Sequence, residues 1–106
     1  MVTLTEKQHF NKVYNSNKKW HTAYFVLFFK DSETKRVGFS VSKKVGNAVC
    51  RNLIKRRLRS LYRKSESDTI NGDMILLAKQ GIDKASYNVL QSQYLHALSK
   101  LKLVAR

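Results

Sequence analysis

The spacing of apolar residues changes along this chain of 106 residues, from that of a helix to that of a strand and back. Apolar residues recur at every third or fourth position on a helix packed on one side, and at every second position on a half-buried strand. The predicted elements are a helix over 6–17, strands over 22–29 and 36–42, a helix over 48–64, a strand over 73–79 and a helix after 86. This order, α-β-β-α-β-α, is typical of a two-layer α+β sandwich, and we expect residues 1–106 to form a single domain.

The ends of these elements carry local signals. A threonine three residues before a glutamate or glutamine has the spacing of a capping box, and asparagine and serine are favoured helix caps. The predicted caps are Thr3 with Glu6 or Thr5 with Gln8 for the first helix, Asn47 for the second and Ser86 for the third. The first two strands are most simply joined as a hairpin.

The predicted helix over residues 48–64 has two faces of opposite character. Its apolar face contains Cys50, Ile54, Leu58 and Leu61, flanked by Val49 and Tyr62. Its other face contains a cation at every fourth position, Arg51, Lys55, Arg59 and Arg63, with Asn52 and Arg56 beside them. Like charges four residues apart cost an isolated helix about 0.2–0.5 kcal/mol per pair, and no acidic residue of this helix relieves them. Such a face favours a polyanionic partner.

The charge of the whole chain points the same way. Lysine and arginine number 21 and acidic residues 7, which gives a formal net charge of +14, and residues 36–64 hold ten of the basic residues and none of the acidic ones. A helix face that is merely solvated normally mixes the two signs. We therefore predict a nucleic-acid-binding protein.

Composition argues against other classes. No stretch approaches the roughly 18 apolar residues of a membrane span, and the N-terminus lacks the apolar segment of a signal peptide. Cys50 is the single cysteine, so it cannot form an internal disulfide and is expected to be a small core residue. We expect a cytoplasmic protein with no membrane partner.

Residues 43–47 connect the second predicted strand to the basic helix. Lys43 and Lys44 flank the start of that helix, where free backbone N–H groups attract phosphate. Gly46 permits backbone conformations that other residues avoid. The segment is therefore a candidate phosphate site.

Aromatic residues in two elements leave alternatives open. Phe10 and Tyr14 share one face of the first helix, and they are either core residues or platforms on which bases of a single strand stack. In the second predicted strand, Val37, Phe39 and Val41 share one side, and small or polar residues share the other. Alternation alone does not decide which side nucleic acid would approach.

The run VSKKVGNAVCRN, followed by IKRRLR and preceded by FNKVYNSNK, resembles the signature of the protein subunit of bacterial ribonuclease P. The resemblance covers nearly the whole chain, but Leu53 stands where the family usually has an arginine. It implies the family fold, with a left-handed βαβ crossover around the basic helix. It also implies a partner RNA subunit that holds Mg²⁺ and removes the 5′ leader of precursor tRNA, with one protein for each RNA.

On this interpretation the protein contacts two RNAs. Residues expected to bind the RNA subunit are Lys43, Lys44, Asn47, Arg51, Asn52, Lys55, Arg56 and Arg59. Residues expected to contact the leader are Phe10, Tyr14 and Phe39. Leu53 lies at the edge of the apolar face on the helical wheel, so we expect it to pack against the core.

No catalytic or metal site is predicted in the polypeptide. A metal-dependent nuclease needs converging carboxylates, and the acidic residues of this chain lack such a spacing, while its histidines are far apart. Two alternatives to the ribonuclease P interpretation are a ribosomal-type RNA-binding protein and a self-sufficient nuclease that uses carboxylates such as Asp68. A helix-turn-helix DNA reader is disfavoured because a strand and a loop precede the basic helix.

Overall fold

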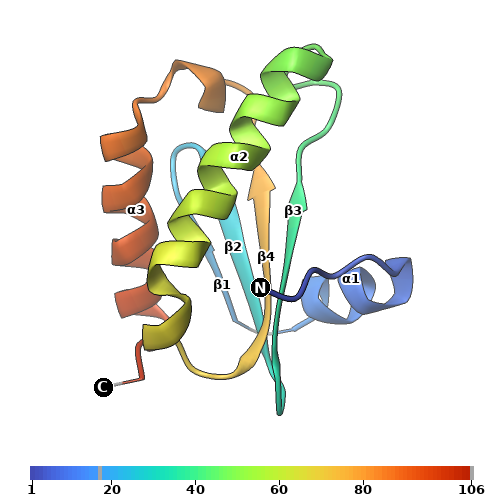
Figure 1. Ribbon diagram of the computed structural model, residues 1–106, viewed down its shortest axis with the longest axis vertical. Helices are drawn as coiled ribbons and strands as arrows, with labels where there is room; N and C mark the ends of the chain where they lie inside the picture. Colours follow the sequence, from blue (N-terminus) through green and yellow to red (C-terminus); the bar gives the residue numbers. More distant parts are fainter. Residues whose placement is uncertain (17, 106) are drawn as a thin grey trace.

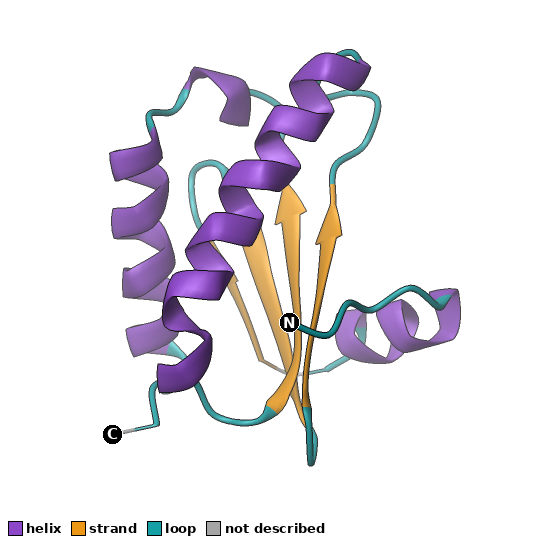
Figure 2. Ribbon diagram, in the orientation of Figure 1, coloured by secondary structure: helices purple, strands orange, loops and turns teal. Residues whose placement is uncertain are grey.

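The computed structural model describes residues 1–16 and 18–105. Within them the chain forms α1 (Lys7–Tyr14), β1 (Lys18–His21), β2 (Phe25–Asp31), β3 (Lys35–Ser40), α2 (Ala48–Ser65), η1 (Glu66–Asp68), β4 (Gly72–Ala78), η2 (Ile82–Lys84) and α3 (Tyr87–Lys100), where η is a short 3-10 helix. The strands form one sheet in the order β1-β2-β4-β3, and α2 and α3 cover one of its faces (Figures 1 and 2). The predicted α+β fold class is confirmed.

The predicted order lacks one strand. β1 pairs antiparallel with β2 and forms the edge of the sheet next to α3. In the turn between the two strands, Thr22 Oγ1 accepts hydrogen bonds from the backbone N–H groups of Tyr24 and Phe25, at 3.2 and 3.0 Å. Because threonine side chains can satisfy the backbone in this way, residues 22–24 form a turn and the strand begins at Phe25.

The predicted hairpin between the strands over 22–29 and 36–42 is wrong. β2 pairs antiparallel with β4, and β3 pairs with β4 in parallel, so β4 lies between them. Every residue of β4 except Leu77 is buried. A strand that is apolar on both faces is more stable with a neighbour on each side, which accounts for its central place.

The connection β3–α2–β4 is left-handed. In Figure 1 both strands point upward, α2 lies in front of the sheet, and the chain passes from β3 on the right to β4 on the left. Parallel β-α-β connections are right-handed in about 98% of cases. The crossover implied by the resemblance is therefore present, and it brings the start of α2 to the end of the sheet where β3 and β4 finish.

The main core lies between the sheet and the helices α2 and α3. Alternate residues of β2 point to this side, and Phe25, Leu27 and Phe29 are at most 1% exposed. The α2 residues buried against them are Ile54, Leu58, Leu61, Tyr62 and Ser65. The predicted apolar face of this helix is confirmed, with Cys50 half-buried at its start.

Two other apolar residues of α2 lie outside the core. Val49, predicted to flank the apolar face, is 79% exposed because the first turn of α2 extends beyond the ends of the strands (Figure 1). Leu53 is 41% exposed, so the prediction that it packs against the core is wrong. Both side chains are open to solvent or to a partner.

The first helix, α1, packs on the opposite face of the sheet. Val13 of α1 and Leu4 are buried against Ile75 of β4. Neither predicted capping box forms: the N-cap is Glu6, without a side-chain cap. Thr3 instead forms a bridge with Val37 at the outer edge of β3. The helix ends at Tyr14, and Asn17, the predicted last residue, lies outside the described residues.

Two tyrosines of the main core are held in their neutral form. Tyr94 is 1% exposed, and its hydroxyl lies 2.7 Å from Ser65 Oγ. Burial raises the pKa of Tyr94 far above its usual value, and burial is also the main reason why the pKa of Tyr62 is raised to about 12.

This burial predicts a loss of stability in alkali. Above pH about 10 a tyrosine of the unfolded chain releases its proton while Tyr94 keeps its own, so the unfolded state binds fewer protons and the free energy of unfolding falls as pH rises. In Tyr94→Phe we expect a smaller fall between pH 9 and 11, measured by urea unfolding. At pH 9 the free energy of unfolding of the variant should be lower by about 1 kcal/mol, because the hydrogen bond to Ser65 is lost. Equal falls in the two proteins would contradict this account.

Candidate nucleic-acid interface

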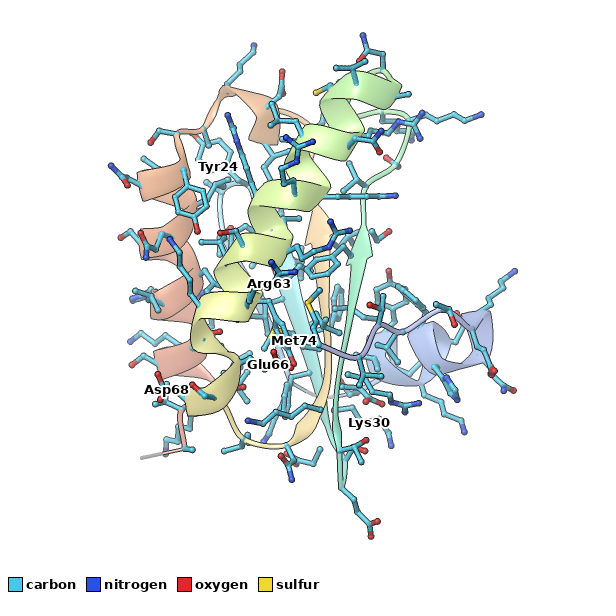
Figure 3. The ribbon with its side chains drawn as sticks, viewed as in Figure 1. Tyr24, Lys30, Arg63, Glu66, Asp68 and Met74 are labelled. Atoms are coloured by element: carbon cyan, nitrogen blue, oxygen red, sulfur yellow. The ribbon has the colours of Figure 1, made fainter. Side chains whose placement is uncertain are left out.

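The outer face of α2 is a cationic surface. Asn52, Arg56, Arg59 and Arg63 are exposed along it, and Arg63 extends from the front of the helix in Figure 3. The four salt bridges found among the described residues involve none of the α2 cations. Since α2 itself contains no acidic residue, these four ion pairs leave the positive charge of this surface uncompensated.

The cations spaced four residues apart do not all lie opposite the core. Arg51 and Lys55 are half-buried, and the buried Arg51 Nε has no hydrogen-bond partner within residues 1–16 and 18–105. The Arg59 guanidinium lies 5.9 Å from the centre of the Phe39 ring of β3. The four cations spaced four residues apart therefore differ in exposure, from half-buried at Arg51 and Lys55 to exposed at Arg59 and Arg63.

The start of α2 has the predicted cap. Asn47 Oδ1 accepts a hydrogen bond of 2.9 Å from the backbone N–H of Cys50. Lys43 and Lys44 are exposed in the preceding loop, so free N–H groups and two cations lie close together along the chain. Anions are stabilised at such a helix start.

Gly46 has a different role from the one predicted. Its backbone does not adopt a positive φ, unlike that of Gly81. An added Cβ would instead lie 2.8 Å from Cys50 Sγ, so a glycine is needed because the helix start approaches closely. The backbone-freedom argument is therefore wrong at this position.

A second candidate surface lies on the opposite face of the sheet, where α1 carries two half-buried aromatic side chains. The Phe10 ring packs on Gly38 of β3, where an added Cβ would lie 2.6 Å from Phe10 Cζ. The Tyr14 ring makes an edge-to-face contact with Phe28, with 4.9 Å between ring centres. The centres of the Phe10 and Tyr14 rings are 6.1 Å apart, so the structure brings these two predicted residues together.

Phe39 does not join them. It packs against the core on the α2 side of the sheet, under Arg59, whereas Gly38, the residue before it, faces Phe10. The three aromatic residues predicted for one ligand are thus divided between two faces. Phe39 lies with the α2 cations.

Sequence reasoning missed Phe28. This half-buried residue of β2 contacts Tyr14 and pairs with Ile75 of β4, so it points to the α1 face; Leu77 of β4 and Ser40 of β3, also half-buried, lie two residues further along the same face. The signal was available in the strand: Phe25, Leu27 and Phe29 alternate with Val26 and Phe28, so the two sets face opposite sides.

Arg36 is a basic residue that is already paired with a carboxylate. Its Nε and Nη2 donate hydrogen bonds of 2.9 and 2.8 Å to the two carboxylate oxygens of Asp73, which is 5% exposed. These hydrogen bonds are the main reason why the pKa of Arg36 is raised. The pair fixes β3 to β4 and is not available to phosphate.

The described residues show no sign of a metal centre or a membrane segment. No group of three or more histidine, cysteine or acidic side chains lies close enough to hold a metal ion in the described ranges. No helix there is both long enough and apolar enough to cross a membrane.

Comparisons with known proteins agree on one family. A family profile described as Ribonuclease P matches residues 2–102. The chain is 38% identical to the ribonuclease P protein component of Natranaerobius thermophilus, over 100% of this chain and 95% of the relative. It is 41% identical to that of Citrifermentans bemidjiense, over 93% and 87% of the two chains. The solved Staphylococcus aureus RNase P protein superposes with a TM-score of 0.89 at 28% identity, over 98% of each chain.

The contact between Phe10 and Gly38 generates a prediction. Gly38→Ala must displace the Phe10 ring, and we expect it to destabilise the protein by about 1–3 kcal/mol, as overpacking does. In a Phe10→Ala background the same substitution should cost much less, because the ring is gone. Urea unfolding of the four proteins in this double-mutant cycle measures the coupling. An equal cost in both backgrounds would show that the contact is absent.

Proposed function

This chain belongs to the ribonuclease P protein family, and from that premise we propose that it uses two separate surfaces to bind two RNAs. It is a protein component of the endoribonuclease ribonuclease P, an RNA-binding protein of tRNA processing whose partner is the ribonuclease P RNA. We infer that precursor tRNA is the second RNA, that one protein binds one RNA subunit, and that the complex works in the cytoplasm. Family membership disfavours the ribosomal-type alternative.

The α2 surface is assigned to the RNA subunit. Its proposed contacts are Lys43, Lys44, Asn47, Arg51, Asn52, Lys55, Arg56 and Arg59. The observation that carries the assignment is the row of cations on α2, a helix that contains no acidic residue and takes part in none of the four salt bridges found among the described residues. Phosphates that replace condensed counterions would remove the repulsion within this helix. Phe39, under Arg59, is assigned to the same surface.

We expect Leu53 to cost this surface one phosphate contact. An arginine at its exposed position could reach phosphate, whereas a leucine cannot. We propose that this chain binds its RNA subunit with one phosphate contact fewer than relatives that have arginine there.

The α1 face of the sheet is assigned to the 5′ leader of precursor tRNA. Phe10, Tyr14 and Phe28 gather there, on the side opposite the core contacts of α2. Bases of a single strand stack on aromatic side chains for about 1–3 kcal/mol each without a fixed sequence. This chemistry suits a leader whose sequence differs from one tRNA to another.

Catalysis is assigned to the RNA subunit, with Mg²⁺ held mainly by that RNA. The described chain offers no cluster of carboxylates for metal-dependent hydrolysis, and the role proposed for the protein is to reduce phosphate repulsion. A protein that supplies cations lowers the bulk Mg²⁺ that the RNA needs, and added monovalent salt weakens the effect.

Reconstitution tests the proposal. A 5′-extended precursor tRNA is incubated at low Mg²⁺ with a bacterial ribonuclease P RNA alone, with this protein alone, and with both. We expect cleavage at the mature 5′ end only in the mixture. Cleavage by the protein alone, after nuclease treatment to remove bound RNA, would overturn the assignment and favour the self-sufficient nuclease, with Asp68 among the first carboxylates to replace.

The phosphate contacts predict a change in salt dependence. Arg51→Ala should weaken binding to the RNA subunit and reduce the slope of log K against log salt by about one contact, whereas Leu53→Arg should raise it by about one. Filter binding between 50 and 400 mM salt measures both slopes. Lys84→Ala, an exposed cation of η2, is the matched control and should leave the slope unchanged. An unchanged slope in Arg51→Ala would contradict the assignment of this face.

The leader surface predicts a change that depends on the substrate. Tyr14→Ala in the reconstituted complex should weaken binding of a precursor with a long leader by about 1–3 kcal/mol, the value of one stacked base. Binding of a substrate with a one-nucleotide leader should be unaffected. Equal losses for the two substrates would show that Tyr14 acts on the fold or on the tRNA body.

A further inference from the structure

The edge of the sheet next to β2 is formed by β1, whose side chains alternate between two environments. Lys18 and Trp20 are half-buried on the α3 side, where the centre of the Trp20 ring lies 5.8 Å from that of His96. Lys19 and His21 are exposed on the other side, the one on which α1 packs. The α1 face of the sheet is therefore open to solvent at β1.

Lys19 lies next to the aromatic residues of this face. It is directly opposite Phe28 in the antiparallel pairing of β1 with β2, and residues in such a pair have Cβ atoms about 4.5–5.5 Å apart on the same face. Phe28 in turn contacts Tyr14 edge to face, with 4.9 Å between ring centres. The aromatic pair is thus followed, one strand further out, by a cation at the edge of the sheet, which is the left edge in Figure 1.

Lys19 differs from two other cations of the same face. Arg36 is paired with Asp73, and Lys30 lies directly opposite that aspartate in the pairing of β2 with β4. Lys19 takes part in none of the four salt bridges found among the described residues, and its partner in the sheet is an aromatic residue. Its charge is therefore available to a ligand that lies on the aromatic residues.

A single RNA strand presents two kinds of group to such a surface, bases that stack and phosphates that carry charge. Proteins that bind single strands combine aromatic side chains for the bases with cations that follow the backbone. On the α1 face, Phe10, Tyr14 and Phe28 offer the aromatic side chains. Lys19 offers a cation beside them, at the distance of one neighbouring strand.

We propose that Lys19 binds a phosphate of the 5′ leader of precursor tRNA, one strand away from the bases that stack on Tyr14 and Phe28. This inference rests on the assignment of the α1 face to the leader. It adds an electrostatic contact to the stacking contacts, so that binding of the leader depends on salt. Because a phosphate contact carries no sequence information, Lys19 acts on leaders of any sequence.

The affinity of the reconstituted complex for precursor tRNA, measured at several salt concentrations, tests the proposal. Each phosphate contact to a single strand contributes about 0.7 to the slope of log K against log salt, which amounts to about fivefold in affinity between 1 M and 0.1 M salt. For a precursor with a long leader, Lys19→Ala should therefore lower the affinity about fivefold at 0.1 M salt and reduce the slope by about 0.7. For a substrate with a one-nucleotide leader, neither quantity should change. Lys19→Arg, which keeps the charge, should retain the affinity and the slope.

Lys18→Ala is the matched control, because it removes the same charge from the neighbouring residue on the other side of the sheet, where Lys18 Nζ lies 3.4 Å from Asp31. It should leave the affinity for both substrates unchanged. An unchanged affinity in Lys19→Ala, equal losses for the two leaders, or the same loss in Lys18→Ala would overturn the proposal. Urea unfolding of each variant separates loss of binding from loss of folding.

Tyr14→Ala, measured in the same assay, distinguishes the failure of this inference from the failure of the leader surface. If Tyr14→Ala shows a loss that depends on the leader and Lys19→Ala shows none, Lys19 is not a leader contact and the leader surface stands. If neither variant shows such a loss, the assignment of the α1 face to the leader is wrong, and the inference about Lys19 fails with it.

Discussion

Burial of one side of α2 against the sheet is the contact on which the other features of this protein depend. Ile54 and Leu58 are fully buried there, and each buried aliphatic side chain contributes about 1.5–3 kcal/mol. The like-charge pairs along the helix cost only about 0.2–0.5 kcal/mol each. Hydrophobic burial therefore outweighs the repulsion. It also fixes the rotation of the helix, so that the cations project outward and toward β3.

The same contact separates the two surfaces. Because α2 occupies one face of the sheet, α1 and its aromatic residues pack on the other, and Gly38 admits the Phe10 ring at close range. The Arg36–Asp73 pair fixes β3 to β4 between these layers. A net charge of +14 repels itself in the free protein, so a bound RNA stabilises the folded state by mass action. Folding and RNA binding are therefore coupled through the charge of α2.

Local features of the fold could be predicted from the sequence, and long-range ones could not. Asn47 and Ser86 cap their helices as predicted, since a cap depends on residues three positions away. Strand order depends on which strand is buried on both faces, and neighbours in sequence do not reveal this. The predicted hairpin between β2 and β3 therefore failed, as did the start of the first strand, where the Thr22 side chain forms a turn.

The candidate site shows the same division. The cations of α2 follow from helical spacing alone, and Phe10 and Tyr14 share a face for the same reason. That Phe39 lies under Arg59 while Phe28 joins the α1 face depends on which side of the sheet each helix covers. Val49 and Leu53 were misplaced because a helical wheel does not show where a helix extends past its sheet.

The central claim is that α1 and α2 face different RNAs. It is tested most directly by tethering an iron chelate to a single cysteine, at Lys12→Cys on α1 or at Val49→Cys on α2, with Cys50 replaced by serine. Hydroxyl radicals then cut RNA near each position in the complex of protein, RNA subunit and precursor tRNA. We predict cuts in the 5′ leader from position 12 and cuts in the RNA subunit from position 49. Cuts by both positions in the same segment of one RNA would contradict the account.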